Sequence, residues 1–357
     1  MRSVFDRRTF LASGGAAILA CTIPVTQVKL AFARSSEIFT FAIVSDAHIE
    51  QIHGAQFVRN WDRGLLRAVA ETNLLSPAPD FVVFGGDLAQ HGTRAELEHG
   101  AEILSALHAP ARYVIGEHDY YLDMGESWSK LFGPLWYSFD HKGVHFVVLN
   151  SILTHDVAIL SRGVTGEERI RQIGSIENSG RSPFMVGDQQ RLWLADDLKR
   201  IAKSTPIVVL SHAPLQKLYK PWNFWTEDAD EVHALLMPFD RVTVIYGHVH
   251  QLQYGQVGNI SFHSVMATAW PYPYPRSYTP SESYLPKLTV PMNRADPFFE
   301  RDGTGWQFVS LDSGRAEIYY NLYNNTARTV VFNSLRGRPE DADYQSSDAV
   351  TPPQLHY

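Results

Sequence analysis

Gly116-Glu117-His118-Asp119 directly follows Tyr113-Val114-Ile115, an apolar run that is typical of a short buried strand. Three ionisable side chains in a row cannot all be buried without partners, because each would lose its hydration. The stretch is therefore either a solvated turn or part of a site that needs charge. Four other places decide between these interpretations, since each is an apolar run that also ends in Asp or His.

These four runs are rich in β-branched and aromatic residues and are predicted strands, at 39–44, 81–84, 206–210 and 242–246. They lead into Ser45-Asp46-Ala47-His48, Gly85-Gly86-Asp87, Ser211-His212-Ala213-Pro214 and Gly247-His248-Val249-His250. Parallel strands place their carboxyl ends at one edge of a sheet, where the following loops converge on a common site. Because side chains alternate along a strand, we expect Asp46 and His48 to reach one metal ion, and His248 and His250 likewise.

The residue types at these strand ends predict the kind of metal. Carboxylates and imidazoles without thiolates favour manganese, iron or zinc. There are too many candidate ligands for one tetrahedral ion, so we expect two ions, divalent or of mixed valence, that share a carboxylate. Such ions lie about 3.5–4 Å apart and clamp both the attacking and the leaving oxygen of a phosphoryl group.

The motifs, in this order and with this spacing, resemble those of the calcineurin-like metallophosphoesterase family over roughly residues 38–265. The resemblance implies an α/β fold with layers, in which two facing mixed β-sheets are flanked by helices. It implies a metal-dependent phosphoric ester hydrolase, in which a metal-activated hydroxide attacks a phosphomonoester or phosphodiester. The substrate would be a small phosphate ester.

The resemblance also implies a role for each residue. The first metal would take Asp46, His48 and His250, Asp87 would bridge, and the second metal would take Glu117, His212 and His248. His118 would protonate the leaving oxygen or steady the phosphate, and Asp119 would orient His118.

Within the family, Gly86-Asp87-Leu88-Ala89 followed by His91-Gly92-Thr93 looks most like the class III cyclic-nucleotide phosphodiesterase branch. Gln90 stands where purple acid phosphatases carry a tyrosine ligand, so a tyrosinate-bound iron centre is not expected.

Glu117 departs from the family pattern, which has Asn at this position. With two divalent ions, the two aspartates, one hydroxide and this carboxylate, the formal charge is zero, whereas an amide leaves one positive charge. A less positive centre attracts phosphate less and favours a more highly charged ion such as ferric iron. Glu117 therefore marks one alternative, a non-hydrolytic dinuclear metalloprotein with a redox or assembly role. A separate alternative is a surface-binding module whose metals are structural.

Helices are expected at about 56–75, 93–108, 188–203 and 228–238, and further strands at 112–115, at 144–149 and as a pair within 307–323. Thr93 and Glu96 have the spacing of a capping box, and Asp228 is the expected cap of its helix. The metallophosphoesterase domain is predicted to span 37–323, with insertions at about 151–186 and 270–303. The second insertion, rich in proline and aromatic residues, either walls the cleft or is a packed insertion. Residues 324–357 form a C-terminal strand or tail.

The N-terminal residues 1–33 are predicted to be an export signal rather than part of the fold. Arg7-Arg8-Thr9-Phe10-Leu11 precedes a weakly apolar stretch and Ala31-Phe32-Ala33, an order that resembles a bacterial twin-arginine signal. The protein would then engage the twin-arginine export machinery and be periplasmic or secreted. Cys21, the single cysteine, lies in a loose lipoprotein-like box, so a lipid anchor is the alternative. The net charge of −7, without a basic block, argues against nucleic-acid binding.

Overall fold

The structure is a computed structural model that describes residues 38–52, 56–57, 59–155, 183–269, 304–312, 314–322, 330–333 and 338–341. The chain divides into two units, Met1–Arg34 and Ser35–Tyr357, and every described element belongs to the second. The predicted export signal and the segment 270–303 lie outside the described residues, as does 156–182 of the first insertion.

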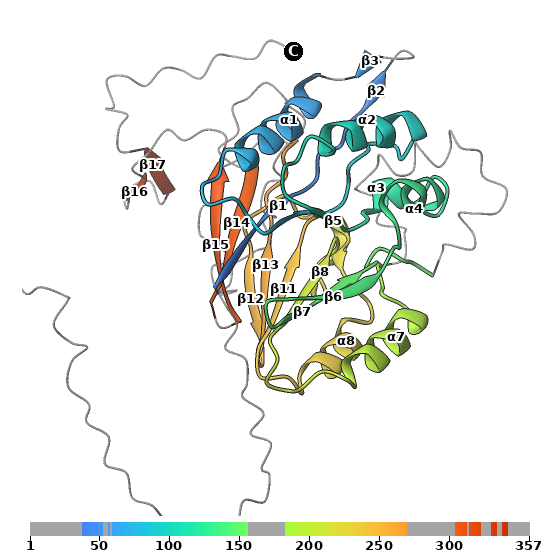
Figure 1. Cartoon of the computed structure of the whole chain (residues 1–357), viewed down its shortest axis with the longest axis vertical. Coiled ribbons are helices and arrows are strands. Elements are labelled where there is room, and N and C mark those ends of the chain that lie inside the picture. Colours follow the sequence, from blue (N-terminus) through green and yellow to red (C-terminus); the bar gives the residue numbers. More distant parts are fainter. Residues whose placement is uncertain are drawn as a thin grey trace, which may run out of the picture. The chain divides into compact units, whose positions relative to one another are not determined.

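Two mixed sheets form the centre of the second unit (Figure 1). The five-stranded sheet has the order β15 (Arg315–Leu322), β14 (Gly305–Asp312), β1 (Phe39–Val44), β4 (Phe81–Phe84) and β5 (Ala111–Tyr113). The six-stranded sheet has the order β12 (Tyr254–Val257), β13 (Ile260–Ser264), β11 (Val242–Tyr246), β8 (Ile207–Ser211), β7 (Val144–Leu149) and β6 (Tyr137–His141). In the five-stranded sheet β1, β4 and β5 run parallel, and β14 and β15 pair antiparallel. In the six-stranded sheet the four central strands run parallel and the two outer strands antiparallel. The parallel strands therefore bring their carboxyl ends to one edge.

The remaining described elements are helices and short strand pairs. The helices are α1 (Arg59–Asn73), α2 (Arg94–Leu104), α3 (Glu117–Tyr120), α4 (Glu126–Phe132), α7 (Asp188–Leu198), the 3-10 turn η1 (Lys220–Trp222) and α8 (Ala229–Leu236). The short strands are β2 (Gln51–Ile52) with β3 (Gln56–Phe57), β9 (Lys217–Tyr219) with β10 (Phe224–Trp225), and β16 (Val330–Asn333) with β17 (Arg338–Asp341). None of the described helices is long and apolar enough to cross a membrane.

Alternation along β1 explains how one strand serves two hydrophobic layers. Phe41 and Ile43 belong to the apolar cluster between the two sheets, where the Phe41 ring meets the Phe146 ring edge-on at 5.7 Å. Ala42 and Val44 point to the opposite face and join the cluster beneath the helices. Both faces of β1 are thus buried, which matches the continuous apolar run in the sequence. Burial of each large apolar side chain stabilises the folded state by about 1.5–3 kcal/mol.

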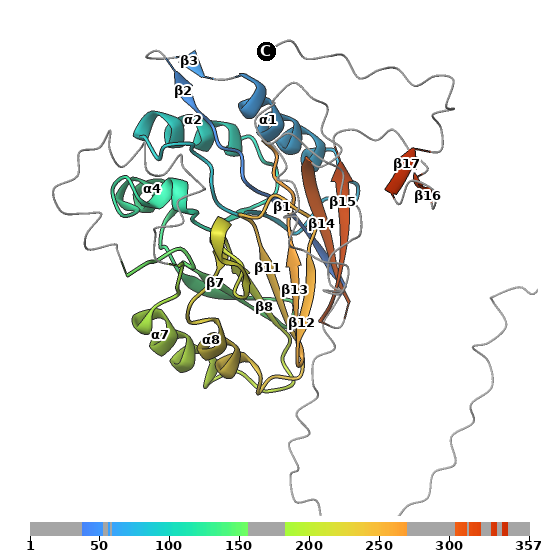
Figure 2. The same ribbon diagram turned by 180° about the vertical axis from the view of Figure 1, so that it is seen from behind.

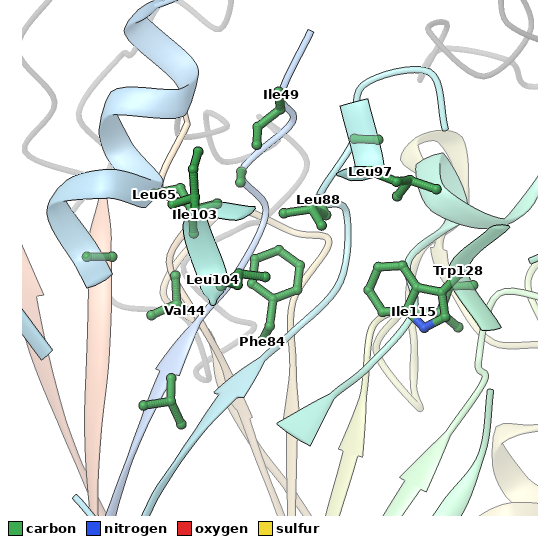
Figure 3. Packing of buried hydrophobic residues seen from close by; sticks show 14 of the residues in the cluster. Val44, Ile49, Leu65, Phe84, Leu88, Leu97, Ile103, Leu104, Ile115 and Trp128 are labelled. Atoms are coloured by element: carbon green, nitrogen blue, oxygen red, sulfur yellow. The ribbon is translucent and has the colours of Figure 1, made fainter. Parts of the chain in front are cut away.

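Helices cover the outer face of each sheet, so the domain has four layers. Leu65 of α1 and Leu97 of α2 pack with Phe84 over the five-stranded sheet (Figure 3). Leu194 of α7 and Leu236 of α8 pack over the six-stranded sheet, on the side away from α1 and α2 (Figure 2). The predicted architecture of two facing mixed sheets flanked by helices is confirmed.

Of the two predicted helix caps, one is present and one is wrong. Thr93 Oγ1 accepts from the Glu96 N–H at 3.3 Å, and the Glu96 carboxylate accepts from the Thr93 N–H at 3.1 Å, which completes the capping box of α2. The side chain of Asp228 does not cap α8. Its carboxylate accepts instead from the N–H groups of Val186 and Gly187, at 2.9 and 2.8 Å, because these buried donors precede α7 and need a partner.

Candidate metal centre

The loops after β1, β4 and β5 of one sheet and after β8 and β11 of the other converge, and among their buried side chains are the seven predicted metal ligands. The seven form two groups, in each of which the available ligand atoms lie within 4.8 Å of one another. The first group is Asp46, His48 and His250, and the second group is Asp87, Glu117, His212 and His248. The structure therefore brings together every residue that the sequence predicted as a metal ligand, and their role as ligands stays a prediction.

The backbone at most of these residues is left-handed, a conformation that L-residues rarely adopt. The φ angles are 54° at Asp46, 46° at His48, 53° at Asp87, 64° at His248 and 46° at His250. Each such residue costs about 1–3 kcal/mol, and strain of this kind clusters at functional sites. The fold therefore holds these loops in an unfavourable backbone conformation that directs their side chains toward the centre.

This backbone overturns the argument from strand alternation. The flanking strands β1 and β11 end before the first residue of each pair, so neither pair lies on a strand face. The left-handed turns send His248 to the second group and His250 to the first, although only one residue separates them. The prediction that this pair reaches one metal ion is therefore wrong.

Glycines make room for the close approach of the loops. A Cβ on Gly86, where φ is +104°, would lie 2.4 Å from His212 Nδ1, and a Cβ on Gly116 would lie 2.1 Å from Asp87 Oδ1. Neither contact is possible without displacing a candidate ligand. The glycines of the sequence motifs are thus required by the packing of the centre itself.

Backbone hydrogen bonds fix the two aspartates of the centre. Asp46 Oδ1 accepts from the His248 N–H and Asp87 Oδ1 from the His118 N–H, both at 3.0 Å. The other oxygen of Asp87, Oδ2, lies 3.1 Å from His212 Nε2 and 3.6 Å from His48 Nε2. Asp87 therefore stands between the two groups, in a position to bridge two ions.

Hydrogen bonds on the outer side of the imidazoles set their tautomers. His212 Nδ1 donates to the Gly85 carbonyl at 2.8 Å, and His48 Nδ1 donates to Gln90 Oε1 at 3.0 Å. Each ring then presents the lone pair of Nε2 toward the centre. His48 Nε2 and His250 Nε2 lie only 3.1 Å apart.

The unpaired atoms of the second group fit a cation. Glu117 Oε2, His212 Nε2 and His248 Nε2 are buried and form no hydrogen bond. Glu117 Oε2 and His212 Nε2 are 3.0 Å apart but are not aligned for one. Buried polar atoms are rarely left unsatisfied, and a carboxylate oxygen facing an imidazole lone pair is the donor set of a metal site. The residues present therefore fit the two ions that the sequence predicts.

The pKa directions of these side chains describe the same crowding of charge. Burial and the nearby charge of Glu117 hold the pKa of Asp87 well above its usual range. Burial also opposes ionisation of Glu117, but His248 and His212 outweigh it and lower the pKa of Glu117 well below its usual range. Two carboxylates within one buried site repel each other, and a cation between them would relieve this.

His118 lies against this centre, in a cluster with His48 and Asp87, but its orientation is not set by Asp119. His118 Nδ1 donates to the backbone carbonyl of Gln90 at 2.6 Å, and burial lowers the pKa of His118 to about 4.

Asp119 has a different task from the predicted one. Its carboxylate accepts from the N–H groups of Leu88 and Ala89, each at 2.9 Å, and of Gly116 at 3.2 Å. It thereby ties the loop after β4 to the start of α3, because these buried donors have no partner in a strand. The prediction that Asp119 orients His118 is wrong. Sequence reasoning singled out Gln90 only as the counterpart of a tyrosine ligand and missed its contacts with His48 and His118.

Aromatic side chains border the second group. The rings of Phe184 and Phe224 meet the His248 ring edge-on at 5.3 and 5.4 Å. Phe184 belongs to the described part of the first insertion, whose two ends are joined by hydrogen bonds between Leu153 and Met185. The insertion is therefore rooted beside the candidate centre.

Comparison with known proteins gives a consistent result. The family model described as calcineurin-like phosphoesterase matches residues 39–252, more than half of the chain. A protein of Arcobacter nitrofigilis named probable glycerophosphodiester phosphodiesterase GpdQ is 22% identical over 228 residues, or 64% of this chain and 72% of that protein. A dimetal phosphatase from Danio rerio has a similar fold, with a TM-score of 0.50, 15% identity and coverage of 80% of this chain and 99% of that chain.

Proposed function

Because the chain belongs to the calcineurin-like phosphoesterase family, whose members are metal-dependent hydrolases, we propose that it is an exported phosphoesterase with two metal ions. One observation carries this proposal: two groups of buried carboxylates and imidazoles meet at Asp87, whose Oδ2 faces both. When bound there, two ions would acidify a water molecule toward neutral pH and offset the charge of the transferring phosphoryl group.

The chain's own residues would divide the remaining work. Asp46, His48 and His250 would hold one ion, Glu117, His212 and His248 the other, and Asp87 both. His118 keeps its Nδ1 proton on the Gln90 carbonyl, so Nε2 is the atom that exchanges a proton with the leaving oxygen or contacts the phosphate. The buried setting excludes bulk water and strengthens these interactions.

Within the family we place the chain closest to the class III cyclic-nucleotide phosphodiesterases, which makes a phosphodiester the first substrate class to test. The motif Gly86-Asp87-Leu88-Ala89 and the similarity to a probable glycerophosphodiester phosphodiesterase support this choice.

The test is a metal and activity assay on the protein from residue 34 onward. The protein is stripped with EDTA and reloaded with manganese, iron or zinc. Bound metal is then counted, and hydrolysis of p-nitrophenyl phosphate and bis(p-nitrophenyl) phosphate is followed. Two ions per chain with turnover support the proposal. Two ions without turnover on a broad panel of esters would refute the hydrolytic function.

That second outcome would favour the alternative, a dinuclear metalloprotein with a redox or assembly role. Glu117 is the observation behind it, because a third carboxylate lowers the charge of the centre and favours ferric iron. A spectroscopic signature of mixed-valence iron that responds to reductant would support this alternative.

Export is proposed from Arg7-Arg8 and the segment that follows them. The test replaces both arginines with lysine in the full chain and follows its location by cell fractionation. We expect the native chain in the periplasm or medium and the variant in the cytoplasm. A native chain that stays with the membrane unless Cys21 is replaced would support the lipid anchor instead.

A further inference from the structure

We propose that Glu117 makes the metal centre a charge filter, which selects monoanionic phosphodiesters over dianionic phosphomonoesters. The inference rests on the proposed function, because it concerns the substrate of the same centre. Glu117, the residue that departs from the family motif, would then determine substrate specificity.

The carboxylate of Glu117 is directed into the centre. Oε1 lies 2.7 Å from His248 Nδ1, and Oε2 lies 3.0 Å from His212 Nε2. Asp46 and Asp87 each give one oxygen to a backbone N–H, whereas Oε2 of Glu117 is buried and has no hydrogen-bond partner. Among the described residues, no backbone N–H therefore neutralises part of the charge on Oε2 of Glu117, which faces the centre.

No lysine or arginine side chain pairs with this carboxylate in the part of the chain that the structure describes. Every ion pair there that involves Asp46, Asp87 or Glu117 is with an imidazole, and none is with a lysine or arginine. Relative to an amide at this position, the carboxylate lowers the total charge of the centre by one unit.

One unit of charge acts differently on the two substrate classes. A phosphodiester carries one negative charge, whereas a phosphomonoester or inorganic phosphate carries two above neutral pH. A charge about 5 Å away, at an effective dielectric constant near 20 and with some screening, changes affinity by about 10- to 100-fold for each unit of ligand charge. The dianion is therefore disfavoured by this factor relative to the monoanion.

The experiment compares Glu117→Gln, which removes the charge and keeps the length, with the native protein, each loaded with two metal ions. Binding of inorganic phosphate and of dimethyl phosphate is measured by calorimetry at pH 8. kcat/KM is measured for p-nitrophenyl phosphate and bis(p-nitrophenyl) phosphate. Glu98→Gln is the matched control, because it removes an exposed carboxylate on α2 that pairs with Arg94 and lies outside the candidate centre.

We expect Glu117→Gln to raise affinity for phosphate relative to dimethyl phosphate by about 10- to 100-fold, with the same shift in the ratio of the two kcat/KM values. Glu98→Gln should leave both ratios within twofold. An unchanged ratio in a fully loaded Glu117→Gln protein would overturn the inference. So would loss of an ion in both Glu117→Gln and Glu117→Asn, because the carboxylate would then be needed to hold the metal. If the native protein turns over no ester, the proposed function fails, and the phosphate affinities alone still decide the filter.

Discussion

His145 and His212 are both buried, and they belong to neighbouring strands of one sheet, yet their surroundings differ completely. His145 on β7 lies between two carboxylates, with Nδ1 2.7 Å from Asp140 and Nε2 2.9 Å from Asp197. His212, just after β8, donates Nδ1 to the Gly85 carbonyl, but its Nε2 has no hydrogen-bond partner.

We call Asp140, His145 and Asp197 the closed clamp. Both ring nitrogens of the buried His145 have a carboxylate partner there, as the polar atoms of a buried structural side chain usually do. In the metal centre the atoms converge without satisfying one another, and the backbone is strained as well. Both histidines are buried, so it is their partners that distinguish the histidine of the clamp from the candidate metal ligand.

The largest effect is expected from Asp87→Ala, which tests whether the two groups form one centre. Because Asp87 Oδ2 faces both groups, the variant should bind fewer than two ions and lose about a thousand-fold or more in kcat/KM, the equivalent of several kcal/mol of transition-state stabilisation. Metal is counted by mass spectrometry beside the kinetic assay. A variant that keeps two tightly bound ions would show that Asp87 is not shared.

Gln90→Ala is expected to have a smaller and one-sided effect. Gln90 Oε1 holds the Nδ1 proton of His48, and removing such a partner weakens a metal ligand about 10- to 100-fold. Calorimetric titration of the metal-free protein should show one ion bound more weakly and the other unchanged. Gln90→Glu, which keeps an acceptor oxygen, should restore much of the affinity. Equal weakening of both ions would mean that the residue supports the fold and not His48.

The layered fold and the candidate ligands could be predicted from the sequence, because both depend on local patterns of apolar and polar residues. A continuous apolar run indicates a strand buried on both faces, and the runs at 39–44 and 144–149 predict β1 and β7 at their full length. Polar residues directly after such runs indicate the edge of the sheet where the strands end. The family resemblance then divided these residues between two ions.

What the sequence did not reveal depends on contacts between distant loops. Gln90 reaches His48 across 42 positions, and the Asp119 carboxylate reaches Leu88 across 31. Left-handed backbone at Asp87 is equally hidden, because nothing in the residue type demands it. Positions of this kind are set by tertiary packing, to which local propensity and spacing are blind.

The closed clamp should respond to mutation in stability alone. Asp197→Asn removes the charged partner of His145 and weakens the acceptor for Ser138, so we expect a loss of about 1–3 kcal/mol in the free energy of unfolding. Metal content and kcat/KM should not change. The control is Asp196→Asn, an exposed neighbour with pairs at 3.4 Å, which should stay within about 0.5 kcal/mol of the native protein. A loss of bound metal in Asp197→Asn would break the distinction between the clamp and the centre.

The smallest expected effect is a change of Tm with pH, whose sign should differ between a carboxylate outside the centre and one within it. Asp80 lies outside the centre; burial opposes its ionisation, but bonds from Lys142, the Thr40 N–H and His141 outweigh it and lower its pKa. A lowered folded pKa stabilises the protein above the unfolded value, and this stabilisation is lost as pH falls through the folded pKa. Asp80→Asn should therefore reduce Tm by about 1–2 °C at pH 7, as for a surface pair, with the gap closing toward pH 3.

Asp87 should give the opposite sign when EDTA keeps the protein free of metal. Its pKa is raised by burial and by Glu117, so its ionisation costs stability as pH rises above the unfolded value. Asp87→Ala should then have the higher Tm at pH 7, with the advantage shrinking as the solution is acidified. Thermal unfolding of both variants across pH 3–8 checks this. If both substitutions lowered Tm at pH 7, the carboxylates of the centre would be satisfied without a cation. The centre would then not differ from the closed clamp in this respect.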